Sequence, residues 1–162
     1  MEESLFRSRF YIHIWEKVHR IYFNLYRTMN MEIHIKLIGY FLLLLALIHL
    51  IFPRYFHWKK ELKTLSLINR QMMLIHTFFI ALTVFLMGLL CVFYARDLIR
   101  TNLGRSISFG LGIFWSCRLF IQFFGYSSEL WKGKKFETVI HVLFVFIWTY
   151  LSVVFLLASW KH

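Results

Sequence analysis

Five polar side chains lie within or close to long apolar stretches, and their types would allow them to bind a ligand there. They are three histidines, an arginine and a glutamine: His49, His76, Arg118, Gln122 and His141. An arginine at the middle of a membrane-spanning helix costs at least ~2.5 kcal/mol on insertion, so a charge at this depth needs a reason. Gln122 follows Arg118 by about one helical turn, on the same face. We expect both side chains to point away from lipid.

Imidazole and guanidinium groups in one layer can bind several kinds of cofactor. Neutral imidazoles from facing helices ligate haem iron, as in a haem b site, and Arg118 would pair with a haem propionate. A quinone is the second candidate, because histidine or arginine can hydrogen-bond to its carbonyl oxygens. The third is a divalent metal bound by His49, His76 and His141, since imidazole suits zinc, copper or iron. A di-iron carboxylate site is disfavoured, because no Glu-x-x-His motif lies in the four long apolar stretches.

The same layer also has a structural interpretation. Histidines near the end of a span often lie at headgroup depth, and a buried network of arginine, glutamine and histidine joins helices by hydrogen bonds. Ser108, Gly112 and Ser116 recur every four residues, a spacing typical of helices that pack closely. No Gly-x-Ser-x-Gly motif or phosphate-binding loop is present, so hydrolase and nucleotide chemistry have no local support.

Four long apolar stretches must position these residues. They cover about residues 36–52, 72–95, 106–126 and 139–160, and the first is expected to end at Pro53. At about 1.5 Å per residue, helices of this length cross a hydrocarbon layer of ~30 Å. In lipid the backbone must satisfy its own hydrogen bonds, so the stretches are predicted to be helices. The sequence therefore predicts an all-α integral membrane protein with four transmembrane helices in an up-down bundle.

An up-down order would bring the five polar residues into one layer on the bundle axis, near one membrane surface. His49 lies near the end of the first stretch, His76 near the start of the second and His141 near the start of the fourth. Asn69, His76 and Thr83 repeat every seven residues, and we expect their face of the second helix to turn toward this layer.

Residues 1–35 differ from the four-helix domain at 36–162, because charged and apolar residues are mixed throughout them. This pattern favours an amphipathic helix that lies in the plane of the membrane interface. A second interpretation is that Met29 or Met31 is the true start of the chain.

Composition and charge set the class of protein. Hydrophobic residues make up 59% of the chain and charged residues 17%, which excludes disorder and disfavours a water-soluble domain. The net charge is +11, and most basic residues lie between the apolar stretches, beside Tyr and Trp. This placement indicates contact with lipid headgroups and not with nucleic acid. Cys91 and Cys117 both lie in apolar stretches, so there is no disulfide framework.

Basic residues divide almost evenly across the predicted membrane. Ten lie on the side of the chain ends and eight on the other. We expect a bacterial-type plasma (inner) membrane with the termini in the cytoplasm.

Two functions follow, and neither settles whether the chain is an enzyme. In the first, a small polytopic membrane protein binds a haem or quinone in its His/Arg layer, as an electron-transfer subunit. In the second, the protein is a non-catalytic scaffold, partner subunit or lipid-interacting protein, and the layer is structural. The partners expected are the lipid bilayer and either another membrane protein or a second copy of the chain.

Overall fold

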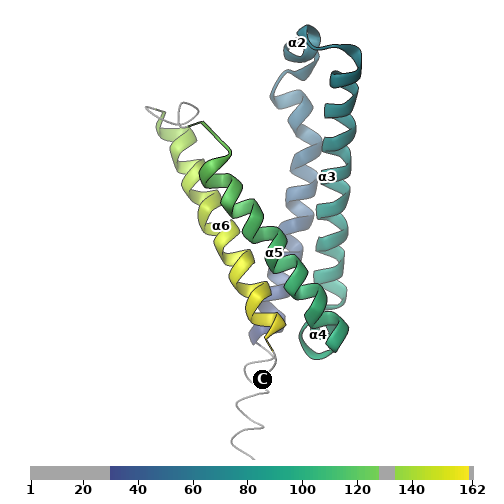
Figure 1. Ribbon diagram of the computed structural model, residues 1–162, viewed down its shortest axis with the longest axis vertical. Coiled ribbons are helices and arrows are strands. Elements are labelled where there is room, and N and C mark those ends of the chain that lie inside the picture. The colour runs from purple at the N-terminus through teal and green to yellow at the C-terminus, as the bar shows by residue number, and fades with distance from the viewer. Residues whose placement is uncertain (1–29, 128–133, 161–162) are drawn as a thin grey trace, which may run out of the picture.

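The computed structural model describes residues 30–127 and 134–160, and all regular secondary structure within them is helical (Figure 1). Four helices are long and apolar enough to cross a membrane: the first helix (Asn30–Tyr55), α3 (Leu67–Phe93), α5 (Asn102–Phe124) and α6 (Lys135–Ser159). Shorter helices connect them: α2 (Trp58–Glu61), the 3-10 helix η1 (Leu62–Thr64) and α4 (Ala95–Arg100). The predicted helical class with four candidate spans is confirmed.

Local capping makes two of the long helices begin earlier than hydropathy predicts, and a third helix ends later. α3 begins at Leu67 and not near residue 72, because the Ser66 side chain accepts a hydrogen bond from the Asn69 N–H at 3.4 Å. α5 begins at Asn102, where the Thr101 hydroxyl caps Gly104 N–H at 2.9 Å. The first helix continues past Pro53 to Tyr55, so the predicted end was wrong. A proline in the last turn removes one hydrogen bond and does not have to end the helix there.

The predicted amino-terminal segment is described only in part. Residues 30–35 belong to the first helix. Residues 1–29, which carry the predicted interfacial helix and the alternative start Met29, lie outside the described residues.

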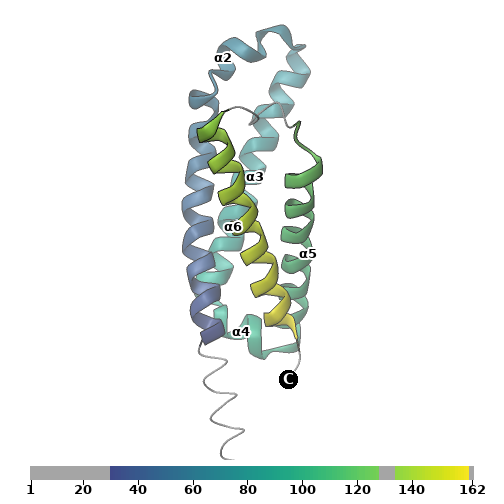
Figure 2. The ribbon, with the colours of Figure 1, turned by 90° about the vertical axis from the view of Figure 1, so that its left-hand side faces the viewer.

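Glycines bring the long helices together in two pairs. A Cβ added at Gly39 of the first helix would lie 3.0 Å from the carbonyl oxygen of Gly88 in α3. A Cβ at Gly112 of α5 would lie 2.7 Å from Leu156 of α6, in agreement with the small-residue spacing seen in the sequence. The two pairs are closest near α4 and diverge toward α2 (Figure 1). The view turned by 90° shows α6 between the first helix and α5 (Figure 2).

The densest packing lies at the end that carries α4. The Ser108 hydroxyl of α5 donates to the Leu98 carbonyl oxygen of α4 at 3.0 Å, and this contact is buried. Almost fully buried side chains from the first helix, α3, α4 and α6 form one hydrophobic core at this end: Ile35, Ile38, Leu42, Cys91, Leu98, Leu151 and Phe155. The opposite half, where the helical pairs diverge, is where the polar residues of interest lie.

The outer surface of the long helices is apolar. On α3, for example, Phe78, Phe79 and Leu86 are each more than half exposed. In water such a surface would be unfavourable, whereas lipid chains would cover it. The fold therefore fits a small multi-pass membrane protein.

Candidate functional site

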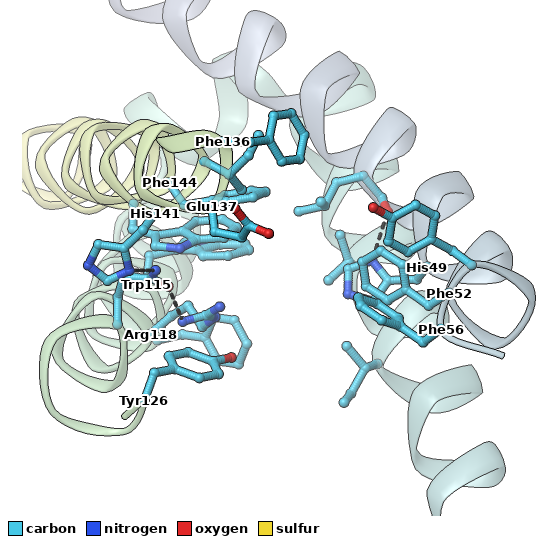
Figure 3. Close-up of a pocket in the computed structure, with 18 residues that line it drawn as sticks. His49, Phe52, Phe56, Trp115, Arg118, Tyr126, Phe136, Glu137, His141 and Phe144 are labelled. Carbon is cyan, nitrogen blue, oxygen red and sulfur yellow. Dashed lines mark hydrogen bonds between the residues drawn. The ribbon is translucent and has the colours of Figure 1, made fainter. Parts of the chain in front are cut away.

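Four of the five polar residues selected from the sequence line one cavity between the helical pairs. We call it the interhelical cavity, and its volume is about 620 Å³. His49 of the first helix lies on one wall, while Arg118 of α5 and His141 of α6 lie on the other (Figure 3). Gln122 of α5 also lines the cavity. Most of the remaining wall is aromatic or aliphatic.

Arg118, Gln122 and His141 form a chain of hydrogen bonds that joins α5 to α6. Arg118 Nη1 donates to Gln122 Oε1 at 3.1 Å, and Gln122 Nε2 lies 2.8 Å from His141 Nδ1. A guanidinium group only donates, so it fixes the amide with its oxygen toward Arg118 and its NH₂ toward His141. His141 Nδ1 must then accept, which puts the proton of the neutral ring on Nε2.

Aromatic rings hold the guanidinium group in place on its other side. Arg118 Cζ lies 5.0 Å from the Trp148 ring centroid and 5.7 Å from that of Tyr126, both within the range of a cation–π interaction. Trp148 in turn stacks on Trp115 at 5.1 Å and on Phe144 at 5.3 Å. This stack forms a flat, rigid wall beside the cation.

The two tryptophans of this wall each carry a polar group, the indole N–H. The indole N–H groups of Trp115 and Trp148 are buried and have no hydrogen-bond partner among the described residues. Buried polar groups are usually paired, and an exception in a native structure calls for an explanation. Here both exceptions occur on residues that line the same cavity.

His49 faces the stack from the first helix. Its Nδ1 lies 2.7 Å from the Leu45 carbonyl oxygen, which can only accept a hydrogen bond, so Nδ1 carries the proton. Nε2 of the neutral ring therefore keeps a lone pair. Phe52 lies beside the imidazole, with the ring centroids 4.8 Å apart.

The charge of Arg118 is not balanced by a nearby carboxylate in the described part of the chain. No carboxylate oxygen of residues 30–127 or 134–160 lies within 4.0 Å of its guanidinium group. Glu137 also lines the cavity but is exposed and lies beyond that distance. Arg118 is only partly buried, so a group that enters the cavity could reach it.

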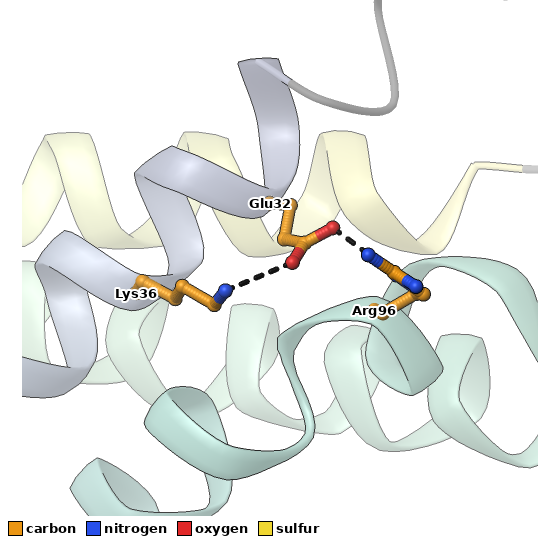
Figure 4. A network of polar contacts seen from close by, with 3 residues as sticks. All are labelled: Glu32, Lys36 and Arg96. Carbon is orange, nitrogen blue, oxygen red and sulfur yellow. Dashed lines mark hydrogen bonds and ion pairs between the residues drawn. The ribbon is translucent and has the colours of Figure 1, made fainter. Parts of the chain in front are cut away.

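Polar contacts close the opposite end of the molecule. Glu32 of the first helix pairs with Lys36 at 2.9 Å and with Arg96 of α4 at 3.4 Å (Figure 4). His34 Nδ1 lies 2.8 Å from the Tyr150 hydroxyl oxygen of α6. The His34–Tyr150 contact joins the two helical pairs at the end where the core is dense, while the interhelical cavity lies in the other half.

His76 lies apart from the other four predicted residues. It is exposed on α3, as are Asn69 and Thr83, and it does not line the interhelical cavity. The expected direction of this face was wrong, because α3 turns a different face inward. That face carries the small or branched residues that let the first helix approach: Ala81, Val84, Gly88 and Cys91.

The three histidines proposed as a metal site are not brought together. Among the residues that the structure describes, no group of three or more His, Cys, Asp or Glu side chains could hold a metal ion.

Sequence reasoning missed the role of the aromatic wall. Trp115 and Trp148 are individually ordinary core residues, and both are indeed buried. The signal that could have found them is spacing, because Trp148 follows His141 by seven residues and Trp115 precedes Arg118 by three. Both therefore share a helix face with a residue of the polar chain.

Comparisons of this chain with protein-family models, with curated proteins and with solved structures find no match.

Proposed function

We propose that this small multi-pass membrane protein binds a hydrophobic ligand with a hydrogen-bond-accepting head in the interhelical cavity, and that the ligand class is a quinone. The observation that carries the proposal is Arg118, held at the cavity wall by Gln122 and Trp148 with no carboxylate within ion-pair distance in the described ranges. A quinone carbonyl oxygen would accept hydrogen bonds from this guanidinium group.

The size and lining of the cavity support the same class of ligand. A volume of about 620 Å³ falls in the usual range of ligand pockets, about 300–1,000 Å³. The planar stack of Trp115, Trp148 and Phe144 offers a surface on which a flat ring could lie. A ligand of this kind would reach the cavity from the surrounding lipid, and a redox-active quinone would make the protein an electron-transfer subunit.

Haem b is less well supported than a quinone. His49 has the tautomer in which Nε2 can ligate iron, with Nδ1–H bound to a backbone carbonyl oxygen. His141 does not, because its Nδ1 accepts from Gln122 and its Nε2 carries the proton. For His141 to serve as a second axial ligand through Nε2, its hydrogen bond with Gln122 would first have to be broken.

A structural role is the alternative, and one observation favours it. The Arg118, Gln122 and His141 chain joins α5 to α6, and such interhelical hydrogen bonds stabilise membrane proteins by about 0.6 kcal/mol on average. A scaffold or partner subunit would need no more than this.

The proposal can be tested by titrating the detergent-purified full chain with decyl-ubiquinone and following the quenching of tryptophan fluorescence. We expect Arg118→Gln to raise the Kd by about tenfold or more, a loss of ~1.4 kcal/mol. The control is Arg100→Gln, which removes the same charge from an exposed site on α4 and should leave the Kd unchanged.

Two results would overturn the quinone proposal: no saturable quenching of the parent protein, or equal affinity in Arg118→Gln. Equal affinity with a lower thermal midpoint would identify the layer as structural. A reduced-minus-oxidised visible spectrum of the same sample tests the haem alternative, because sharp absorption bands lost in His49→Ala would establish haem binding.

A further inference from the structure

A second cavity lies beside the connection between the first helix and α3. We call it the basic cavity, and its volume is about 640 Å³. Four cationic side chains line it: Arg54, Lys59, Lys60 and Arg70. The residues of the first helix that line it differ from those of the interhelical cavity, so the two cavities flank different sides of the same final turn.

A tight turn at His57 builds this cavity. His57 has a left-handed backbone, with φ of 49° and ψ of 38°, a conformation that non-glycine residues seldom adopt. The Lys60 N–H donates to the His57 carbonyl oxygen at 2.8 Å and starts α2 directly after the first helix. The reversal brings Arg54 and Lys59 to the same cavity as Arg70 in the first turn of α3. Such strain tends to occur at functional sites.

The charges around the basic cavity have no acidic counterpart among the residues that the structure describes. No carboxylate lines it, and Glu61 of α2 is exposed and outside the lining. None of the four cationic side chains has an ion pair or a side-chain hydrogen bond with another residue of the described ranges. Like charges at this density repel one another, and an anion between them would remove that repulsion. Arg70 also lies near the positive end of the α3 dipole, which further favours an anion.

The surroundings indicate where the anion comes from. The basic cavity includes Pro53, near the end of a membrane-compatible helix, and the half-buried Trp58. Leu62 and Leu74 add apolar surface to its lining. Tryptophan beside lysine and arginine is typical of headgroup depth in a bilayer, and apolar lining residues suit the start of a lipid acyl chain better than a free ion.

We infer that the basic cavity binds the phosphoryl group of an anionic phospholipid. Arginine and lysine around the cavity would donate charge-assisted hydrogen bonds to the phosphoryl oxygens. This site shares no lining residue with the interhelical cavity, so it stands whether or not a quinone binds there.

The test uses native mass spectrometry of the full chain in micelles that contain equal amounts of phosphatidylglycerol and phosphatidylcholine with the same acyl chains. The parent should retain phosphatidylglycerol preferentially. Arg54→Gln/Arg70→Gln should weaken that retention by about tenfold, because each basic group near an anionic lipid contributes measurably to binding. The matched control is Lys134→Gln/Lys135→Gln, which removes the same charge from exposed positions outside the basic cavity and should keep the preference.

Three outcomes would overturn the inference. The parent could show no preference, the control could lose it as strongly as the cavity variant, or inorganic phosphate at ~10 mM could bind and displace the lipid, which would make a free anion the ligand. If the double arginine variant fails to fold, Lys59→Gln/Lys60→Gln on exposed α2 provides the same test. Quinone titration of each variant separates a failure of this site from a failure of the interhelical cavity.

Discussion

At the scale of single residues, Arg118 determines the hydrogen-bonding state of its neighbours. Its guanidinium group can only donate, so Gln122 must present its oxygen to Arg118 and its NH₂ to His141. One residue thereby sets an amide orientation and a histidine tautomer on the next helix. The direction of these hydrogen bonds predicts what happens when Gln122, which lies between the other two residues, is changed.

Gln122→Glu should give Arg118 the carboxylate that the described residues do not supply. The new ion pair would satisfy the guanidinium group, so the Kd for decyl-ubiquinone should rise by about tenfold. A carboxylate cannot donate to His141 Nδ1, so the histidine should move its proton to Nδ1. Nitrogen-15 NMR of histidine-labelled protein distinguishes the two tautomers.

An unchanged tautomer in Gln122→Glu would show that Gln122 does not fix His141. The isosteric control is Gln122→Met, which has no group to pair with Arg118 and should leave the arginine open to the ligand. Quinone binding that is lost equally in both variants would argue for a change in packing and not in charge.

The residue scale also shows what spacing can and cannot predict. The sequence could predict that Arg118, Gln122 and His141 lie close together. One helical turn separates the first two, and a charge inside a membrane span is costly unless polar groups surround it. His76 could not be placed, because a repeat of seven defines a helix face but not the direction in which that face points. The direction was set by Gly88, which lets the first helix approach the other face of α3.

At the scale of elements, short helix α4 depends on one glycine. A Cβ at Gly104 of α5 would lie 1.9 Å from the Asp97 carbonyl oxygen of α4, so only glycine allows this approach. The approach in turn permits the buried hydrogen bond from Ser108 to Leu98. Hydropathy did not predict α4, because its buried Ala95 and Leu98 are separated by charged residues.

Gly104→Ala should therefore destabilise the protein by about 1–3 kcal/mol, the usual cost of forcing extra atoms into a packed site. Gly110→Ala on the same helix is the matched control, since a Cβ there meets nothing within 4 Å. That change should be neutral or stabilising by up to about 1 kcal/mol, because alanine favours helix. Detergent-unfolding curves followed by circular dichroism measure both, and equal midpoints would contradict the close approach.

At the scale of the whole molecule, two helical pairs are joined at one end and separated at the other. The His34–Tyr150 contact and the core around Leu98 lie at the joined end. The interhelical cavity occupies the other half, and the basic cavity lies at its tip, beside α2. Hydropathy alone was enough to predict the four helices. The divergence of the two pairs depends on the positions at which glycine permits close helix contact, and hydropathy does not reveal those positions.

The proposed up-down order predicts that the carboxyl terminus and the 53–70 connection lie on opposite sides of the plasma membrane. An alkaline phosphatase reporter fused after residue 162 should be inactive in bacteria, whereas one inserted in the 53–70 connection should be active, because this enzyme works only outside the cytoplasm. The reverse pattern would place the termini outside. Activity at both positions or at neither would contradict the up-down order.

The position of the two cavities has a consequence for the lipids around the protein. Both lie in the half of the molecule that contains α2, while the α4 end is closed by a dense core. In a bilayer both would face a single leaflet, so a phospholipid bound in the basic cavity would come from that leaflet alone. The fraction of protein with bound lipid would then depend on the lipid composition of that leaflet and not on the average composition of the membrane.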